Sequence, residues 1–244
     1  MMFIINKTLI LLFIPFICFG QLKFLPKKSK GNCVVEYTYY SLSYVENHEQ
    51  AEWTHYKLDP KRVHVNKASK RDRKKYYKSD IKCGSALHSD YTHSGYERGH
   101  LVPAADMKMD SISVIEVAYM LNISPQKKYF NGGEWLKLED HVRLLAKKNE
   151  IYVTTGGVLS CDLESIGKKN KVSVPKLFYK IIYDDKNKRM TAYLMPNRKL
   201  HSSFENHIVT VDLIETLTGI DFYHQLKDEL EEKLESAKNG LTSN

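Results

Sequence analysis

The chain has 244 residues, of which 42% are hydrophobic and 27% are charged. These values exclude a disordered polyelectrolyte and leave room for one large domain or two small ones, with a hydrophobic core. The formal net charge is +8, which favours a polyanionic partner without identifying it.

Residues 1–20 have the composition of a secretory signal peptide. Lys7 is followed by an apolar run that Pro15 interrupts, and Gly20 supplies a small residue before a cleavage point. A membrane anchor is the alternative, but the run is shorter than the roughly 20 residues that span a bilayer. We therefore expect cleavage near Gly20, a secreted or periplasmic protein and no stable membrane anchor. Only Lys7 is lost among the charges, so the mature chain stays basic.

Cleavage at this point would leave the cysteines Cys33, Cys83 and Cys161 in the mature chain. An oxidising compartment favours one disulfide, for which three pairings are open, with one thiol left over. The spacing of these cysteines is not that of a zinc site, so we expect structural or incidental roles for them.

The rest of the chain is typical of a mixed α+β fold. Residues 21–32 are polar and basic and predict a linker, whereas residues 33–238 contain no low-complexity segment and predict a single domain. Alternation and β-branched residues predict strands, and spacings of three and four predict helices. The predicted strands are Val34–Tyr40, Trp53–Leu58, Ile151–Thr155 and a hairpin of Leu177–Tyr183 with Met190–Met195; the predicted helices are 134–147, Val209–Leu217 and Phe222–Leu234, and Val114–Tyr119 fits either type.

Residues 61–82 form a basic stretch, in which only Asp72 and Asp80 oppose many Lys and Arg side chains. Tyr76 and Tyr77 are interleaved with the cations, which suits contact with phosphates and occasional stacking on bases. A solvated surface loop is the alternative interpretation.

A cluster of chemically active side chains follows. Within a short span the chain supplies a cation, an imidazole, two amides and a carboxylate: Arg98, His100, Asn122, Asn131 and Glu139. Phosphodiester cleavage needs a base for water, positive charge on the phosphate and a metal ion near the developing alkoxide. Imidazole, guanidinium and hard oxygen ligands can fill these roles. The alternative is a histidine that packs in a loop and asparagines that cap turns.

The order and spacing of these segments resemble the DNA/RNA non-specific endonucleases, of the Serratia extracellular nuclease and mitochondrial endonuclease G type. The family's Asp-Arg-Gly-His signature stands here as Glu97-Arg98-Gly99-His100, and the resemblance extends from about Val34 to about Leu234. It implies an α+β nuclease domain with a central antiparallel sheet flanked by helices. It also implies a ββα-metal finger: a strand with His100, a second strand ending near Asn122, and a helix beginning near Asn131.

The resemblance also implies a role for each residue. His100 is the general base, Asn131 the direct metal ligand and Asn122 an amide that organises the site around the histidine. Arg98 binds phosphate or supports the site. Glu139 holds metal-bound water, because eight residues of straight helix would rise about 12 Å and exclude it from the inner shell of Asn131.

Two positions are less direct matches to the family. Arg73, with Tyr77 and Asp80 after it, fits an upstream arginine of the family better than Arg71, although it also fits an ordinary solvated charge. Glu97 replaces the family's Asp; the charge is kept on a longer arm, so we expect activity to survive in weakened form.

The function expected from the resemblance is a secreted Mg²⁺-dependent endonuclease, with Mn²⁺ as the alternative metal ion. We expect DNA and RNA as substrates and 5′-phosphorylated ends in the products. The resemblance also implies a homodimer, for which the sequence identifies no interface. Two alternatives stay open: a secreted nucleic-acid-binding module of the same fold without turnover, and a phosphodiesterase for a smaller substrate.

Overall fold

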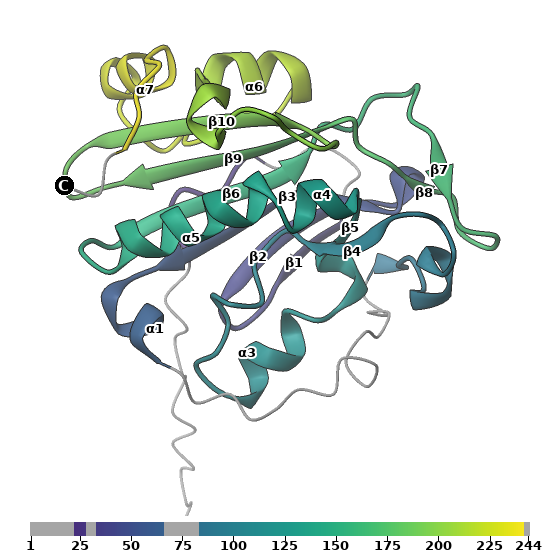
Figure 1. Cartoon of the computed structure of the whole chain (residues 1–244). Coiled ribbons are helices and arrows are strands. Elements are labelled where there is room, and N and C mark those ends of the chain that lie inside the picture. Colours follow the sequence, from purple (N-terminus) through teal and green to yellow (C-terminus); the bar gives the residue numbers. More distant parts are fainter. Residues whose placement is uncertain (1–21, 28–32, 66–82, 242–244) are drawn as a thin grey trace, which may run out of the picture.

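A computed structural model of the chain describes residues 22–27, 33–65 and 83–241 (Figure 1). The expected signal peptide, most of the basic stretch and Arg73 lie outside these residues. The strands are β1 Cys33–Glu36, β2 Tyr40–Val45, β3 Gln50–Leu58, β4 Glu97–His100, β5 Ile123–Gln126, β6 Ile151–Gly157, β7 Ser165–Ile166, β8 Val172–Ser173, β9 Leu177–Asp184, β10 Arg189–Pro196 and β11 Ile208–Val209. The α-helices are α1 Pro60–His64, α3 Ser111–Glu116, α4 Lys128–Asn131, α5 Glu134–Ala146, α6 Val211–Thr218 and α7 Asp228–Glu235.

The centre of the fold is an antiparallel sheet. In the described part of the chain its seven strands have the order β1-β2-β3-β6-β9-β10-β11. β4 pairs with β5 outside this sheet, and β7 pairs with β8. The expected α+β fold with a central antiparallel sheet flanked by helices is therefore confirmed.

Helices cover both faces of the sheet (Figure 1). Strand β9 shows why both faces need a cover: successive side chains of a strand point to opposite faces, and here both sets include buried apolar side chains. Phe178 and Ile182 pack in the core beneath α5, whereas Tyr179 and Ile181 pack in the core beneath α6 and α7. Lys180 belongs by alternation to the α5 side.

Helix α5 forms where the sequence predicts it. Trp135, Leu138, Val142 and Leu145 recur every three or four residues, and all four are buried against the sheet. This apolar stripe is the main reason that the segment is helical, since burial of one face stabilises a helix of this length more than intrinsic propensity does.

Two predicted elements were wrong in extent. The predicted strand Val34–Tyr40 is interrupted at residues 37–39, where the backbone and hydroxyl of Thr38 donate hydrogen bonds to Glu116 at 3.0 and 2.9 Å. The chain therefore folds back as the β1–β2 hairpin. The predicted helix Phe222–Leu234 begins only at Asp228, because Tyr223 has a φ of 53° and is buried in the sheet core.

A disulfide joins Cys33 to Cys83, and the Cys161 thiol is exposed. This selects one of the three pairings that the sequence left open. Residues 22–27 of the expected linker lie against the sheet: the Phe24 ring packs on Tyr152 at 5.0 Å.

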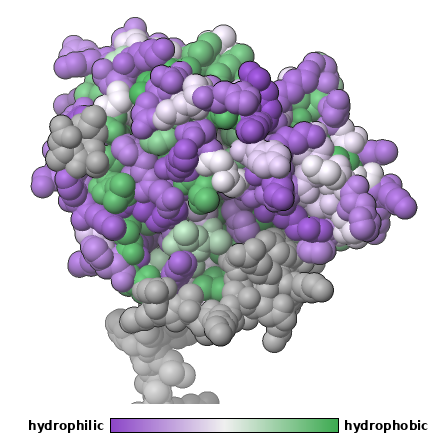
Figure 2. All heavy atoms as spheres, viewed as in Figure 1, coloured by the Kyte–Doolittle hydropathy of each residue, from purple (hydrophilic) through white to green (hydrophobic). Residues whose placement is uncertain are grey.

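The face shown in Figure 2 is mainly hydrophilic, with scattered apolar residues. In the part of the chain that the structure describes, no helix combines the length and the apolar character needed to cross a membrane.

Candidate active site

Strands β4 and β5 and helix α4 form a compact ββα unit beside the main sheet (Figure 1). His100 is the last residue of β4 and faces Ile123, the first residue of β5. Asn131 is the last residue of α4. The second strand thus begins after Asn122 and does not end there, and Asn131 closes one short helix instead of opening a long one. Because α4 ends at Asn131 and α5 begins at Glu134, the straight-helix rise does not measure the separation of Asn131 from Glu139.

Asn122 holds the backbone that follows His100. Its Oδ1 accepts the Val102 backbone N–H at 2.8 Å, and its Nδ2 donates to the carbonyls of Val102 and Val117 at 3.0 and 2.9 Å. The Leu101 N–H also donates to the Asn122 carbonyl at 3.0 Å. The side chain is fully buried, and three hydrogen bonds occupy its amide. Asn122 therefore acts on the shape of the loop and not on a ligand.

Glycines allow the close packing of the unit. A Cβ atom at Gly99 would lie 2.1 Å from the Gln126 side chain across the strand pair, and one at Gly133 would lie 2.2 Å from the Tyr129 carbonyl. A larger residue at Gly99 would require the buried Gln126 side chain to move, and one at Gly133 would collide with the backbone of α4.

Glu97 connects the first strand to the helix. Its Oε2 accepts a hydrogen bond from the Asn131 Nδ2 at 2.8 Å. Because this bond uses the nitrogen of the amide, the Asn131 Oδ1 is turned away from Glu97. In the described part of the chain this oxygen accepts no hydrogen bond, and a hard oxygen of this kind suits a divalent cation.

Arg98 anchors the segment that precedes β4. Its guanidinium donates to the His88 carbonyl at 2.8 Å and to the Thr92 hydroxyl at 3.4 Å, and it lies 5.7 Å from the centre of the Tyr91 ring. The side chain is half-buried. Of the two roles expected for Arg98, these contacts describe support of the site.

Glu139 lies in a group of charged side chains between α5 and the sheet. The Arg143 guanidinium pairs with Asp106 at 2.8 Å, and Tyr56 donates to the same carboxylate at 2.8 Å. Burial raises the pKa of Glu139, and the Asp106 charge adds to this shift, whereas the positive charges of Lys180 and Arg143 oppose it. Burial also lowers the pKa of Lys180, and the Glu139 carboxylate opposes that shift. Glu139 is therefore a carboxyl whose charge depends on its cationic neighbours.

The sequence analysis did not single out Lys180 or Arg143. Lys180 is fully buried, donates to the Thr155 hydroxyl at 2.8 Å and lies 4.8 Å from the centre of the Trp135 ring. A lysine at an inward position of an apolar strand was the available signal. For Arg143 the signal was its position four residues after Glu139, which places both side chains on one helix face.

An exposed aromatic and cationic surface adjoins Asn131. Tyr129 in α4 is 65% exposed, and the Lys199 ammonium lies 5.7 Å from its ring centre. On the strand side the Lys127 ammonium lies 3.9 Å from the Tyr96 ring centre. Rings paired with ammonium groups can stack on bases and attract phosphates.

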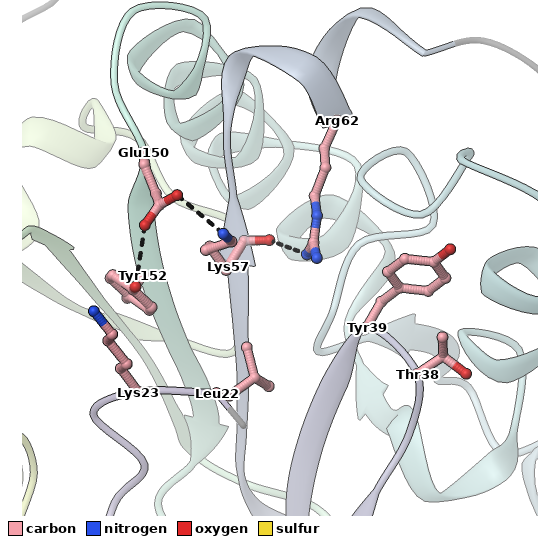
Figure 3. Close-up of a pocket in the computed structure, with 8 residues that line it drawn as sticks. All are labelled: Leu22, Lys23, Thr38, Tyr39, Lys57, Arg62, Glu150 and Tyr152. Carbon is pink, nitrogen blue, oxygen red and sulfur yellow. Dashed lines mark hydrogen bonds and ion pairs between the residues drawn. The ribbon is translucent and has the colours of Figure 1, made fainter. Parts of the chain in front are cut away.

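The hollow drawn in Figure 3 contains none of the predicted site residues. It lies between the N-terminal segment and α1, with a volume of about 390 Å³. Lys57 pairs there with Glu150 at 2.9 Å, and Arg62 donates to the Lys57 carbonyl at 2.6 Å. Because none of the predicted site residues lines this hollow, the chemistry expected from the sequence is sought in the ββα unit.

Comparisons with known proteins show the family to which the whole fold is similar. A model of the family described as DNA/RNA non-specific endonuclease matches residues 23–229. Mitochondrial endonuclease G of Caenorhabditis elegans is 30% identical over 224 residues, which cover 84% of this chain and 72% of that protein. A nuclease of Nostoc sp. is 29% identical over 227 residues, which cover 86% of this chain and 80% of that nuclease. The solved complex of EndoG with EndoGI, which concerns the inhibition of EndoG, matches with a TM-score of 0.72 and 31% identity, over 81% of this chain and 88% of that one.

Proposed function

The chain belongs to the DNA/RNA non-specific endonuclease family, a family of metal-dependent nucleases, and from this premise we propose that it cuts both DNA and RNA with little sequence preference. A hydrolase that acts on nucleic acids follows from the family and from relatives named nucleases. The proposal that the ββα unit is the catalytic site rests on one observation. A hydrogen bond from Asn131 to Glu97 connects the helix of this unit to the strand that ends in His100.

His100 is proposed as the general base. An imidazole titrates near neutral pH, so it can take a proton from the attacking water as that water approaches the phosphorus atom. Asn122 serves this step indirectly, because its hydrogen bonds to Val102 fix the backbone two residues beyond the ring. A fixed ring loses less entropy when it reaches the reactive arrangement.

The Asn131 Oδ1 is proposed to hold the divalent metal ion. The fit rests on the amide orientation that Glu97 imposes and on the chemistry of the donor, since amide and carboxylate oxygens suit Mg²⁺ or Mn²⁺. When bound, Mg²⁺ would neutralise charge on the phosphate and on the leaving oxygen. Water and phosphate are expected to fill the other coordination positions.

Glu139 and Arg98 are proposed to support this arrangement. Glu139 accepts hydrogen bonds from water beside the metal ion in its charged form, which Lys180 and Arg143 favour. Arg98 keeps the segment before β4 in place through the His88 carbonyl. Arg73 remains a proposal from the sequence alone.

Substrate binding is proposed to depend on the phosphate backbone. The chain carries a net charge of +8. Lys199 lies beside the exposed ring of Tyr129 in α4, and Lys127 lies beside the partly buried ring of Tyr96. Contacts to phosphates and stacking on bases carry little sequence information, which accords with cleavage of many sequences.

We also propose that the chain is exported. The apolar run of residues 1–20 and the Cys33–Cys83 disulfide support this proposal, since disulfides persist in oxidising compartments. Because several relatives are mitochondrial, the N-terminal sequence of the protein recovered from cell fractions is the decisive measurement. A mature N-terminus at Gln21 in an exported fraction is expected; an intact Met1 in the cytosol would contradict it.

The homodimer stays a prediction, which light scattering on the mature chain tests.

Digestion of plasmid DNA and of structured RNA by the chain from Gln21 tests the nuclease proposal. Mg²⁺, EDTA and the variants His100→Ala and Asn131→Ala are compared with wild type. Loss of the general base is expected to slow cleavage by about 10²–10⁴-fold. The control His224→Ala, at an exposed position between α6 and α7, is expected to retain full activity.

Cleavage that EDTA abolishes and His100→Ala reduces would support the proposal. Binding without cleavage by wild type in both Mg²⁺ and Mn²⁺ would instead restore the non-catalytic binding module, which relatives named nucleases do not favour. Cleavage of DNA without any cleavage of RNA would contradict the breadth of the proposal but not the enzyme class.

A further inference from the structure

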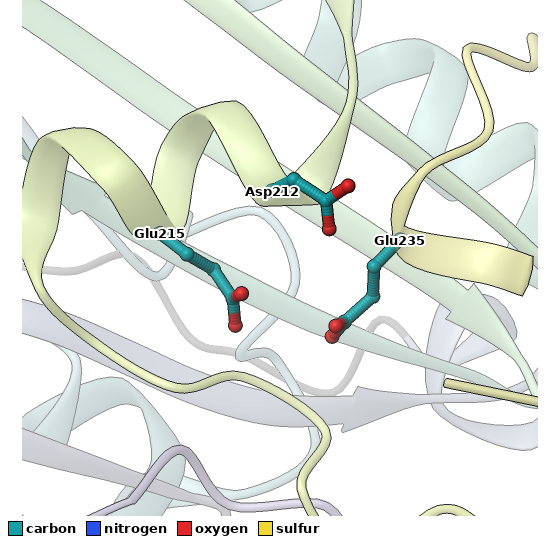
Figure 4. Close-up of side chains that lie close together, drawn as sticks. All are labelled: Asp212, Glu215 and Glu235. Atoms are coloured by element: carbon teal, nitrogen blue, oxygen red, sulfur yellow. The ribbon is translucent and has the colours of Figure 1, made fainter. Parts of the chain in front are cut away.

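Three carboxyl groups converge on the sheet face opposite α5. Asp212 and Glu215 lie one helical turn apart in α6, and Glu235 is the last residue of α7 (Figure 4). One oxygen from each side chain lies within 4.8 Å of the others. Val211, Ile214 and Leu234 pack both helices onto the sheet core that α5 does not touch, so this cluster is separate from the ββα unit.

The most buried of the three carboxyl groups has one oxygen without a hydrogen-bond partner among the described residues. Glu235 is 5% exposed, and its Oε1 accepts no hydrogen bond from any described residue. Figure 4 shows its carboxyl group directed towards those of Asp212 and Glu215. A buried carboxylate without a donor is unfavourable, because it loses hydration and receives nothing in return. The position at the C-terminal end of α7 adds to the cost, since the helix dipole is negative there.

The surroundings add negative charge. Burial, together with the negative charges of Glu215, Glu231, Asp212 and Asp221, raises the pKa of Glu235 to about 9. Among the described side chains, Lys27 is a nearby cation, and it pairs with Asp221 at 3.0 Å. None of the three converging carboxylates forms an ion pair with a described Lys, Arg or His. In a chain with 37 Lys and Arg against 29 Asp and Glu, this local excess of acid calls for a counter-charge.

We propose that Asp212, Glu215 and Glu235 bind a Ca²⁺ ion that joins the end of α7 to α6. The donors are carboxylate oxygens, which Ca²⁺ prefers, and they include neither the imidazole nor the thiolate typical of zinc. Two ligands on opposite sides of a Ca²⁺ ion, each at 2.3–2.6 Å, lie roughly 4.6–5.2 Å apart, which is the largest separation within one shell. The three carboxylate oxygens lie within 4.8 Å of one another and so fit in one shell. Asp212 is exposed, which leaves an entry path and room for water ligands.

One carboxylate of the site is already oriented by the backbone. The Glu215 Oε1 accepts the Phe222 N–H at 2.7 Å, across the loop that connects α6 to α7. The ion would therefore hold three parts of the chain together: the first turn of α6, the loop anchored by Glu215, and the end of α7. Its expected effect is on stability, and it requires nothing of the proposed catalytic residues.

The test measures Ca²⁺ binding and thermal unfolding of the chain from Gln21 after removal of metal ions. In the Asn131→Ala background, which lacks the proposed catalytic ligand, equilibrium dialysis with radioactive Ca²⁺ is expected to give one saturable site per chain. At free Ca²⁺ a hundredfold above Kd, the midpoint of unfolding should rise by about 5–10 °C.

Glu235→Gln keeps the shape of the side chain and removes its charge, and Glu229→Gln is the matched control at an exposed position of α7. Glu235→Gln should abolish both the bound Ca²⁺ and the Ca²⁺-dependent shift while raising the midpoint without Ca²⁺. Glu229→Gln should change neither the binding nor the shift.

Absence of saturable binding to wild type would overturn the proposal and leave a proton as the counter-charge of Glu235. Binding that survives Glu235→Gln, or that Asn131→Ala abolishes, would overturn it as well, because the ion would then lie elsewhere. Neither result depends on nuclease activity, so this proposal and the proposed function can fail separately.

Discussion

Replacement of Glu97 with alanine tests the orientation of the candidate metal ligand. In wild type the Glu97 carboxylate accepts a hydrogen bond of 2.8 Å from the Asn131 Nδ2, and the amide oxygen is therefore turned away from Glu97. Without this acceptor the amide can rotate and present its nitrogen, which cannot bind a cation. A hydrogen bond to a charged group contributes about 1.5–3 kcal/mol, and loss of such a supporting contact typically weakens metal affinity by about 10–100-fold.

The assay is the initial rate of plasmid cleavage at increasing free Mg²⁺. Glu97→Ala should raise the half-saturating Mg²⁺ concentration by about 10–100-fold. Glu97→Gln, which keeps an acceptor oxygen without its charge, should lie between Glu97→Ala and wild type. Glu164→Ala removes an exposed carboxylate and serves as the charge-matched control. Thermal unfolding of each variant establishes that the fold is intact.

An unchanged half-saturating Mg²⁺ concentration in Glu97→Ala would refute this reasoning. A lower maximal rate at the same half-saturation would also contradict it, because the hydrogen bond would then serve a step other than metal binding. Glu97→Asp addresses the departure from the family's signature: the shorter arm must move the backbone to reach Asn131, so we expect weaker Mg²⁺ binding here although Asp is the usual residue of the family.

Three further predictions concern stability and substrate contact. The Cys33–Cys83 bond spans 50 residues. Replacement of both cysteines with serine should therefore lower the free energy of unfolding in urea by at most about 4 kcal/mol. A decrease below about 1 kcal/mol would contradict the chain-entropy argument. Burial lowers the pKa of His55 from 6.5 to about 4. Below pH 6.5 the unfolded chain therefore takes up a proton that the folded chain refuses, and stability should fall by about 2 kcal/mol from pH 7 to pH 5. His55→Gln should flatten this dependence, and an unchanged slope would assign it to other groups. Tyr129→Ala should weaken binding of a labelled single-stranded oligonucleotide in EDTA by about 5–150-fold if one base stacks on the ring, whereas Leu136→Ala, at another exposed apolar position, should not; equal anisotropy curves for the two variants would exclude stacking at Tyr129.

The sequence was informative about the fold where a periodic pattern coincided with burial. The apolar spacing from Trp135 to Leu145 predicted α5, and the alternation from Leu177 to Tyr183 predicted β9. It failed at Thr38 and Tyr223. The first bonds to Glu116, far along the chain, and the second is buried with positive φ. Contacts of this kind override local propensity and leave no local pattern.

The candidate site divides in the same way. The spacing of Arg98, His100, Asn122, Asn131 and Glu139 indicated the family from the sequence, because a family's order of residues is itself a linear property. What each side chain contacts depended on the tertiary structure. The Asn122 amide makes three hydrogen bonds to backbone groups, and Arg98 bonds to the segment before β4.

By itself the sequence determined the family, the α+β class and the stretch that contains the site, because these follow from residue order and hydrophobic period. Only the tertiary structure decided the Cys33–Cys83 pairing, the hydrogen bond between Asn131 and Glu97, and the proximity of Asp212 to Glu235. Each of these is a contact between residues distant in the chain. Its geometry is set by the packing of helices against a common sheet, which no local pattern of residues encodes.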